Sequence, residues 1–348
     1  MTLFDIYRKH VDDAEFTLIV QGVEGREYVD TSPLILGENY IYKVAAVRDG
    51  VLRFSNEYLV VAGFEGISAE GGTVSEVTID GVDYVLHIFN ENDELVVSGS
   101  GEVEYLIVGG GGAGGRFNVG GGGGGGGVLM GSIWLVADTY SVEVGEGGVD
   151  PQVGNATSKN GKDSSIFNIV AYGGGGGSQG FANAPNGTTI TPGLPGGSGG
   201  GGGGTYGSGG ANTAGGAGVD GQGFKGGNGV NNASTRTRAG GGGGGAGQSG
   251  SNASNYNGGK GGDGKLSSIT GVATYYGGGG GGGSNATTSG SSGAGGLGGG
   301  GDGGKQDVVA KSGGDGLGGG GGGVSESTPT SSVRGGRGVV IVRYPKQG

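Results

Sequence analysis

The sequence contains no cysteine, only two histidines (His10 and His87) and no apolar run close to 18 residues. Without cysteine the chain cannot form disulfides, thiolate metal sites or a cysteine nucleophile. Two histidines are too few for a multi-histidine metal site, and no segment has the length and apolarity of a membrane-spanning helix. The N-terminal segment also lacks the basic and apolar regions of a secretory signal. These absences predict a soluble, non-redox protein.

Basic residues are also scarce, because 20 Lys and Arg face 31 Asp and Glu and the net charge is −11. Residues 1–108 carry 20 acidic and 6 basic side chains, whereas the following 240 residues carry 11 acidic and 14 basic side chains. An acidic chain of this kind argues against nucleic acid as a partner. The charge therefore divides the chain into an acidic head and a weakly charged body.

Glycine is in large excess, with 102 of 348 residues, and 91 of these glycines follow residue 108. Such a composition is typical of low-complexity disorder, and the collagen repeat is missing. The glycines nevertheless form blocks, such as 120–127, 240–245 and 277–283, which alternate with polar loops. A flexible linker has no reason to show this alternation. It predicts a bundle of short antiparallel rods joined by loops, the longer ones being 181–192, 229–239, 248–257, 265–276 and 284–292.

A glycine rod has one regular conformation available that needs no side chains, the threefold polyproline II helix. This helix makes no internal hydrogen bonds, so each N–H and C=O must bond to a neighbouring rod or to water. Glycine also loses the most backbone entropy on ordering. We therefore expect a single tract to stay unfolded and a bundle of many tracts to fold as polyglycine II helices.

Strand patterns flank the glycine blocks and predict a β-core. They occupy 74–108, 128–145, 164–172 and 338–344, and Trp134, Leu135, Val136 and Phe167 are expected in the core. His87 alternates with Val85 and Phe89, as a packed or surface strand residue does. The predicted fold class is all-β, with four parts: a β-sandwich in 1–70, a β-rich core in 71–172, a polyglycine II bundle in 173–336 and a closing strand in 337–348.

The head resembles a fibronectin type III domain. The residues that carry the resemblance are IYR at 6–8, YVDTSPL at 28–34, and YIYKVAAVRDG at 40–50 followed by SNEYLVVA. In that family the IYR-like strand is the third of seven, and here it begins almost at Met1, so the resemblance implies a sandwich without its first two strands. Two interpretations stay open: a small independent β-domain, or a docking module that a neighbouring chain completes.

The body resembles the glycine-rich domains that are common in phage tail proteins. The matching residues are EYLIVGGGGAGG (104–115), YSVEVGEGG with NGKDSSIF (140–167), AYGGGGG (171–177) and GGRGVVIVRYP (335–345). Polyglycine bundles are similar in the receptor-binding adhesins of some long tail fibres. The resemblance implies a virion protein of an extracellular phage tail fibre or tip, attached to other tail proteins through residues 1–70 and part of an oligomer or larger assembly.

Loops on a stiff bundle would present side chains for recognition. Tyrosine and arginine are favoured anchors, with Ser, Gly and Asn as adaptable partners. The receptor-binding candidates, for a host protein or glycan, are Phe181, Tyr206, Phe224, Arg236, Arg238, Tyr256, Tyr275 and Tyr276. The alternative is that these residues cap the bundle. Successive loops are expected to alternate between its ends, so that about half of them could face a receptor.

Two glycine motifs imitate nucleotide-binding loops. Gly109-x-Gly111-x-x-Gly114 follows a strand, as the dinucleotide fingerprint does, but glycines follow it where a helix is needed. In Gly259…Gly264-Lys265 the next residue is Leu266 and not the Ser or Thr that would hold magnesium. We expect no cofactor.

The sequence shows no catalytic or metal-binding constellation either. Asp263, Asp302 and Asp315 lie in glycine turns, where aspartate normally bonds to local backbone. We therefore expect no metal and no enzymatic activity. Two other functions stay open beside a tail adhesin: a structural or decoration protein of the virion without a ligand, and a bacterial surface or matrix protein.

Overall fold

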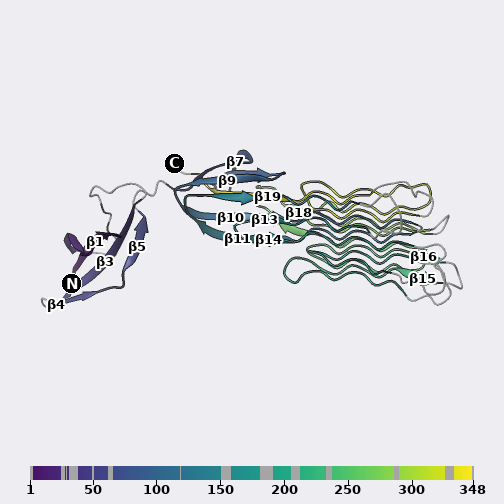
Figure 1. The fold of residues 1–348 in the computed structure, drawn as a ribbon, viewed down its shortest axis with the longest axis horizontal. Coiled ribbons are helices and arrows are strands. Elements are labelled where there is room, and N and C mark those ends of the chain that lie inside the picture. Colours follow the sequence, from purple (N-terminus) through teal and green to yellow (C-terminus); the bar gives the residue numbers. More distant parts are fainter. Residues whose placement is uncertain are drawn as a thin grey trace. The chain divides into compact units, whose positions relative to one another are not determined.

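The computed structural model describes residues 3–24, 28, 30, 38–48, 51–61, 66–117, 119–149, 158–180, 191–204, 212–232, 237–285, 290–325 and 333–346. These residues form strands, turns and extended segments, with no helix among them, so the chain is all-β as predicted. It divides into two compact units (Figure 1). The first is mainly Met1–Ser68, and the second is mainly Ala69–Val97 with Glu102–Lys346.

The first unit is one antiparallel sheet. β1 (Leu3–His10) lies between β2 (Thr17–Val23) and β3 (Asn39–Arg48), and both β4 (Val51–Phe54) and β5 (Tyr58–Val61) pair with β3. Three of the segments that carry the fibronectin resemblance, IYR, YIYKVAAVRDG and SNEYLVVA, contain residues of β1, β3 and β5 respectively. A fibronectin-like sandwich needs a second sheet, which the described residues of this unit do not contain, and most of the segment YVDTSPL lies outside them.

Opposite faces of this sheet carry different chemistry. On one face the Nζ atom of Lys43 lies 3.8 Å from the ring centroid of Phe16 and 4.7 Å from that of Phe54. On the other face Asp30 pairs with Arg8 at 2.8 Å and accepts a 2.7 Å hydrogen bond from the Tyr42 hydroxyl. Burial and this hydrogen bond raise the pKa of Tyr42 to about 12.

The second unit contains a five-stranded sheet in the order β11-β10-β19-β8-β7 and a three-stranded sheet in the order β12-β9-β6 (Figure 1). The predicted closing strand, β19, lies between β10 and β8, so the segment that ends the glycine-rich region enters the same sheet as the segment that starts it. The strands are β6 (Ser68–Glu70), β7 (Thr73–Ile79), β8 (Val82–Phe89), β9 (Asp93–Ser98), β10 (Gly101–Val108), β11 (Val128–Leu135), β12 (Asp138–Val142) and β19 (Val339–Pro345).

Buried side chains from both sheets form the core, from alternate residues in β9, as the two-residue period of a strand requires, and from the consecutive residues 339–342 in β19. The largest include Phe89, Leu95 and Ile107. Two residues predicted for this core, Trp134 and Val136, are instead exposed, Trp134 by 62%. The reason is that β11 is an edge strand of its sheet, and Trp134 and Val136 flank the buried Leu135, so both lie on its outward face.

His87 is buried between the two sheets, which agrees with the structural role predicted for it. Its Nδ1 atom lies 2.8 Å from the Gly71 carbonyl oxygen and therefore carries the proton of this hydrogen bond. The Tyr344 hydroxyl accepts the Ala69 N–H at 2.9 Å, which leaves its own proton for the His87 Nε2 atom at 3.1 Å. The imidazole is thus held neutral, and burial lowers its pKa from 6.5.

This lowered pKa predicts acid sensitivity in a defined range. The folded state disfavours protonated His87, so its contribution is complete above pH 6.5 and declines as the pH falls below that value. Urea unfolding of the full chain between pH 7 and pH 5 should show stability falling more steeply for the wild type than for His87→Gln. His10→Gln, in the first unit, is the control and should keep the wild-type slope for the second unit. Equal slopes for wild type and His87→Gln would contradict the assignment.

The glycine tracts form rods whose hydrogen bonds repeat every three residues. In the rod 109–115, residues 109, 112 and 115 donate to one neighbouring rod, residues 110 and 113 to a second, and residues 111 and 114 to a third. The rods 240–246 and 278–283 follow the same rule. The N–H groups of residues 109 to 115 donate, in that order, to the carbonyl oxygens of Gly127, Lys162, Gly336, Gly124, Lys159, Val333 and Gly121.

A period of three is that of the polyproline II helix, so the bonding pattern supports the predicted polyglycine II conformation. The same bonding pattern also includes the tracts 109–115 and 120–127 in the bundle, although the sequence predicted them in the β-rich core. Residues 120–127 donate to rods at 172–178, 241–244 and 318–324, so this tract lies inside the bundle.

Glycine is required in these rods because neighbouring backbones approach too closely for a side chain. A Cβ atom at Gly122 would lie 2.0 Å from the Gly280 carbonyl oxygen, and one at Gly243 would lie 1.9 Å from that of Gly123. Both obstacles are backbone atoms held by hydrogen bonds on either side, so neither can move aside as a flexible side chain would.

Gly122→Ala should therefore destabilise the second unit by about 3 kcal/mol or more, because overpacking here displaces a whole rod. Thermal and urea unfolding measure the effect. Gly221→Asn is the matched control: Gly221 has a φ of 75°, no atom lies within 4 Å of the place that its Cβ would take, and asparagine tolerates this backbone conformation. If both substitutions cost the same, close rod packing is not what requires glycine.

Candidate functional site

The two ends of the bundle are built differently. At the end next to the five-stranded sheet, most connections between rods are short turns, and several have glycines at positive φ, such as Gly298, Gly299 and Gly318. Two longer connections lie there, the hairpin of β13 (Ser164–Ile166) and β14 (Ile169–Ala171) and the hairpin of β17 (Lys265–Ser267) and β18 (Thr274–Tyr276). These connections pack against the sheet in one apolar cluster, consisting of Leu106, Val108, Val128, Ala246, Ile269, Tyr276, Val339 and Ile341.

The opposite, outer end of the bundle collects the other long loops. Here Val119 bridges to Gly204 and Ser325, and Ala239 bridges to Ser284. The hairpin of β15 (Val230–Asn232) and β16 (Thr237–Ala239) lies at this end, remote from the sheets (Figure 1). The described residues at the outer end flank the ranges 181–190, 205–211, 233–236, 286–289 and 326–332.

The predicted receptor-binding residues are divided between the two ends. At the outer end, Tyr256 is 37% exposed, and Arg238 is only 9% exposed, with its backbone N–H bonded to Asn285. Phe181, Tyr206 and Arg236 lie outside the described residues.

The other three candidates lie at the inner end. Tyr275 is 37% exposed and Phe224 is also exposed, but Tyr276 is only 5% exposed, within the apolar cluster. Tyr276 therefore packs at the end of the bundle and is not displayed for recognition, because the 265–276 hairpin folds back onto the sheet. The eight candidates do not form one surface.

Asp and Asn side chains accept backbone N–H groups of rods at the periphery of the bundle, a role that was not predicted from the sequence. Asp263 accepts the Leu297 N–H at 2.9 Å, Asp302 accepts that of Gly295 at 3.0 Å, and Asp315 accepts that of Arg337 at 2.8 Å. Aspartates expected to bond to local backbone thus bond to a neighbouring rod. The same bond is made by Asn160, Asp163, Asn228, Asn252 and Asn257.

Three of these carboxylates are also paired with cations. Lys260 lies 2.9 Å from Asp263, Lys311 lies 2.8 Å from Asp302, and Arg334 lies 2.7 Å from Asp315. The Arg334 hydrogen bond is the largest cause that lowers the pKa of Asp315 to about 2. The sequence signal for these bonds between rods is an Asp or Asn within a glycine tract, and the same pattern is also typical of a simple turn.

Asp302 offers a test of this edge role. Asp302→Ala removes the acceptor of the Gly295 N–H and should lower the free energy of unfolding by about 1 kcal/mol, whereas Asp302→Asn keeps an acceptor and should lose less than half of that. The pKa of Asp302 is lowered by Lys311 and Gly295, so its contribution is present above pH 3.8 and is lost as the pH falls through its lowered pKa. Urea unfolding at pH 7 and in acid measures both effects. Equal losses for Ala and Asn would contradict the edge role.

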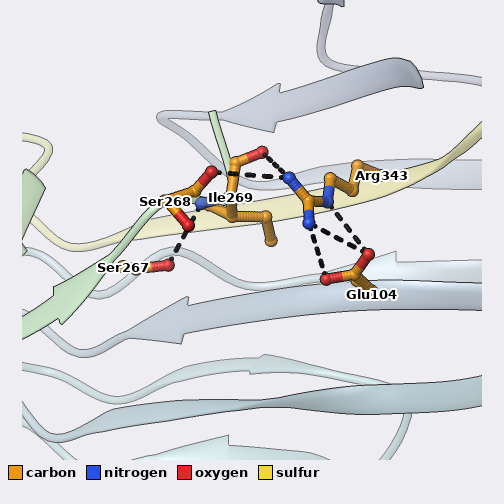
Figure 2. Close-up of polar contacts among 5 residues, drawn as sticks. All are labelled: Glu104, Ser267, Ser268, Ile269 and Arg343. Carbon is orange, nitrogen blue, oxygen red and sulfur yellow. Dashed lines mark hydrogen bonds and ion pairs between the residues drawn. The ribbon is translucent and has the colours of Figure 1, made fainter. Parts of the chain in front are cut away.

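An arginine clamp joins the inner hairpin to the sheet (Figure 2). Arg343 on β19 donates from Nη2 to Glu104 Oε2 at 2.8 Å and from Nη1 to the Ile269 carbonyl oxygen at 2.9 Å. Its guanidinium carbon also lies 4.6 Å from the ring centroid of Tyr84. Beside the clamp, a groove of about 760 Å³ lies between β10, β11 and the hairpin.

Within the described ranges, no three His, Asp or Glu side chains gather in a way that could hold a metal ion. Those ranges also contain no helix that is long and apolar enough to cross a membrane.

The second unit is thus an all-β module in which a pair of sheets carries a bundle of glycine rods. The model of the family described as a glycine-rich domain matches residues 93–345, which extend from β9 through the bundle to β19. The chain belongs to this glycine-rich domain family. No curated protein matches the chain.

Proposed function

We propose that this protein is a structural component of a phage tail, in a fibre or at the tip, and that its glycine bundle presents loops for recognition of the host surface. The observation that carries the proposal is the separation of connections between the two ends of the bundle. Short turns and the hairpins β13–β14 and β17–β18 lie at the sheet end, whereas the residues that flank the other long loops lie at the outer end. Nothing in rod packing itself requires long loops there.

The composition of the outer loops suits recognition. The ranges at that end are rich in Ser, Thr, Asn and Gly, with few charges, and include Tyr206 and Arg236. Such residues provide adaptable hydrogen bonds around aromatic anchors. The ligand class is a host cell-surface protein or glycan, and the role is non-enzymatic, with neither nucleic acid nor membrane insertion involved.

The first unit is proposed as the attachment module to other tail proteins. Its described strands expose large apolar side chains, including Phe54, Tyr58 and Leu59. Exposed apolar patches of this kind mark interaction surfaces. The whole protein would then work in the extracellular virion as part of an oligomer or larger assembly.

A pair of tyrosines tests the recognition proposal, because Tyr256 and Tyr275 are equally exposed at opposite ends of the bundle. Binding of the fluorescently labelled full chain to a panel of Gram-negative and Gram-positive cells should be saturable on at least one strain. Tyr256→Ala, or replacement of 233–236 and 286–289 by Gly-Ser, should weaken that binding about tenfold, the loss typical of an anchor residue. Tyr275→Ala should leave it unchanged.

Two outcomes would favour the other functions. If no strain binds the chain, a structural or decoration protein without a ligand is the better account. If the variants at both ends weaken binding equally, the outer loops are not the recognition surface, and a general adhesive role, as in a bacterial surface or matrix protein, is favoured.

A further inference from the structure

The groove beside the arginine clamp has the features of a binding site, and it lies at the sheet end, away from the outer loops. Its floor is the face of the five-stranded sheet at β10 and β19, and one wall is the β17–β18 hairpin. The polar and aromatic side chains that line it include Tyr84, Glu102, Ser132, Ser267 and Ser268.

The charge of the groove is set by the clamp. Arg343 is engaged by three hydrogen bonds to the Glu104 carboxylate and two to hairpin carbonyl oxygens, so its charge is balanced by Glu104 (Figure 2). Glu102, two residues before Glu104 on the same face of β10, is exposed and lines the groove. The groove therefore carries one uncompensated negative charge, on an acceptor with two oxygens.

Alternation along β10 decides which side chains face the groove. Glu102 and Glu104 lie on the face of the sheet that carries Arg343 and the hairpin. Tyr105 lies on the opposite face, where its ring centroid is 6.4 Å from that of Phe167. The tyrosine ring that the groove offers is therefore that of Tyr84.

These features favour one ligand class. Hydroxyls, a carboxylate and the Tyr84 ring on a rigid sheet match the hydroxyl groups and the apolar faces of sugar rings, and a shallow, polar groove does not suit an apolar ligand. We propose that the groove binds an oligosaccharide that is neutral or carries amino groups, with Glu102 as its principal hydrogen-bond acceptor. This site is independent of the loop surface proposed above.

Isothermal titration of the full chain with four hexasaccharides tests the proposal. The probes are maltohexaose and chitohexaose, which are neutral, a fully deacetylated chitosan hexamer, which is cationic, and a hyaluronan hexamer, which is anionic. We expect binding of at least one neutral or cationic probe and none of the anionic probe. Glu102→Gln should weaken that binding at least about tenfold, since a hydrogen bond to a charged group is lost.

A second pair of variants separates binding from folding. Ser132→Trp fills the groove from an exposed strand position and should abolish binding, whereas Ser141→Trp places the same residue at an exposed position of β12 outside the groove and should not. Failure of all four probes to bind would overturn the proposal. So would wild-type affinity in both Glu102→Gln and Ser132→Trp, or preferential binding of the anionic probe.

Discussion

Lateral hydrogen bonding between glycine backbones is the constraint on which the rest of the structure depends. A rod with three residues per turn points successive N–H groups toward three different neighbours, and each group finds a carbonyl oxygen there. This arrangement brings backbones so close that a Cβ at Gly122 or Gly243 would overlap a carbonyl group. The interior of the bundle therefore leaves little room for apolar side chains, and the hydrophobic clusters lie in the sheets, at the inner end, and at the outer end, where Ala310, Val324 and Val333 pack together.

The same constraint leaves backbone N–H groups without a partner rod at the lateral surface of the bundle, because a peripheral rod lacks a neighbour on one side. The carboxylates of Asp263, Asp302 and Asp315 meet donors that a further rod would otherwise meet. Ion pairs with Lys260, Lys311 and Arg334 then balance the charge of these carboxylates. Side chains thus act at the edge of the bundle as substitutes for backbone, much as capping residues do at the end of a helix.

The sequence predicted the local features well. Apolar strand patterns marked β10 and β19, and glycine blocks marked the tracts whose hydrogen bonds repeat every three residues. It could not predict which end each loop occupies, because some chain reversals lie inside glycine stretches: the turns at 246–249 and 297–299 contain no long loop yet change the direction of the chain. The range 248–257 therefore begins at the inner turn, and the turn 254–257 that ends it lies at the same end as the preceding hairpin of β15 and β16. Burial of Tyr276 likewise depends on a long-range contact that its neighbours in sequence do not reveal.

This distribution has a consequence for how the sequence can vary. Connections at the inner end carry the apolar residues of the cluster around Ile269 and Tyr276, so their sequences are constrained by packing. Bridges such as Val119 to Ser325 and Ala239 to Ser284 tie the outer rod ends together before the long loops begin. The bundle is therefore complete without the loops' side chains, and substitutions in the loops need not disturb the hydrogen bonds that hold the rods. A scaffold of this kind separates stability, which resides in backbone contacts, from the chemistry displayed at its outer end.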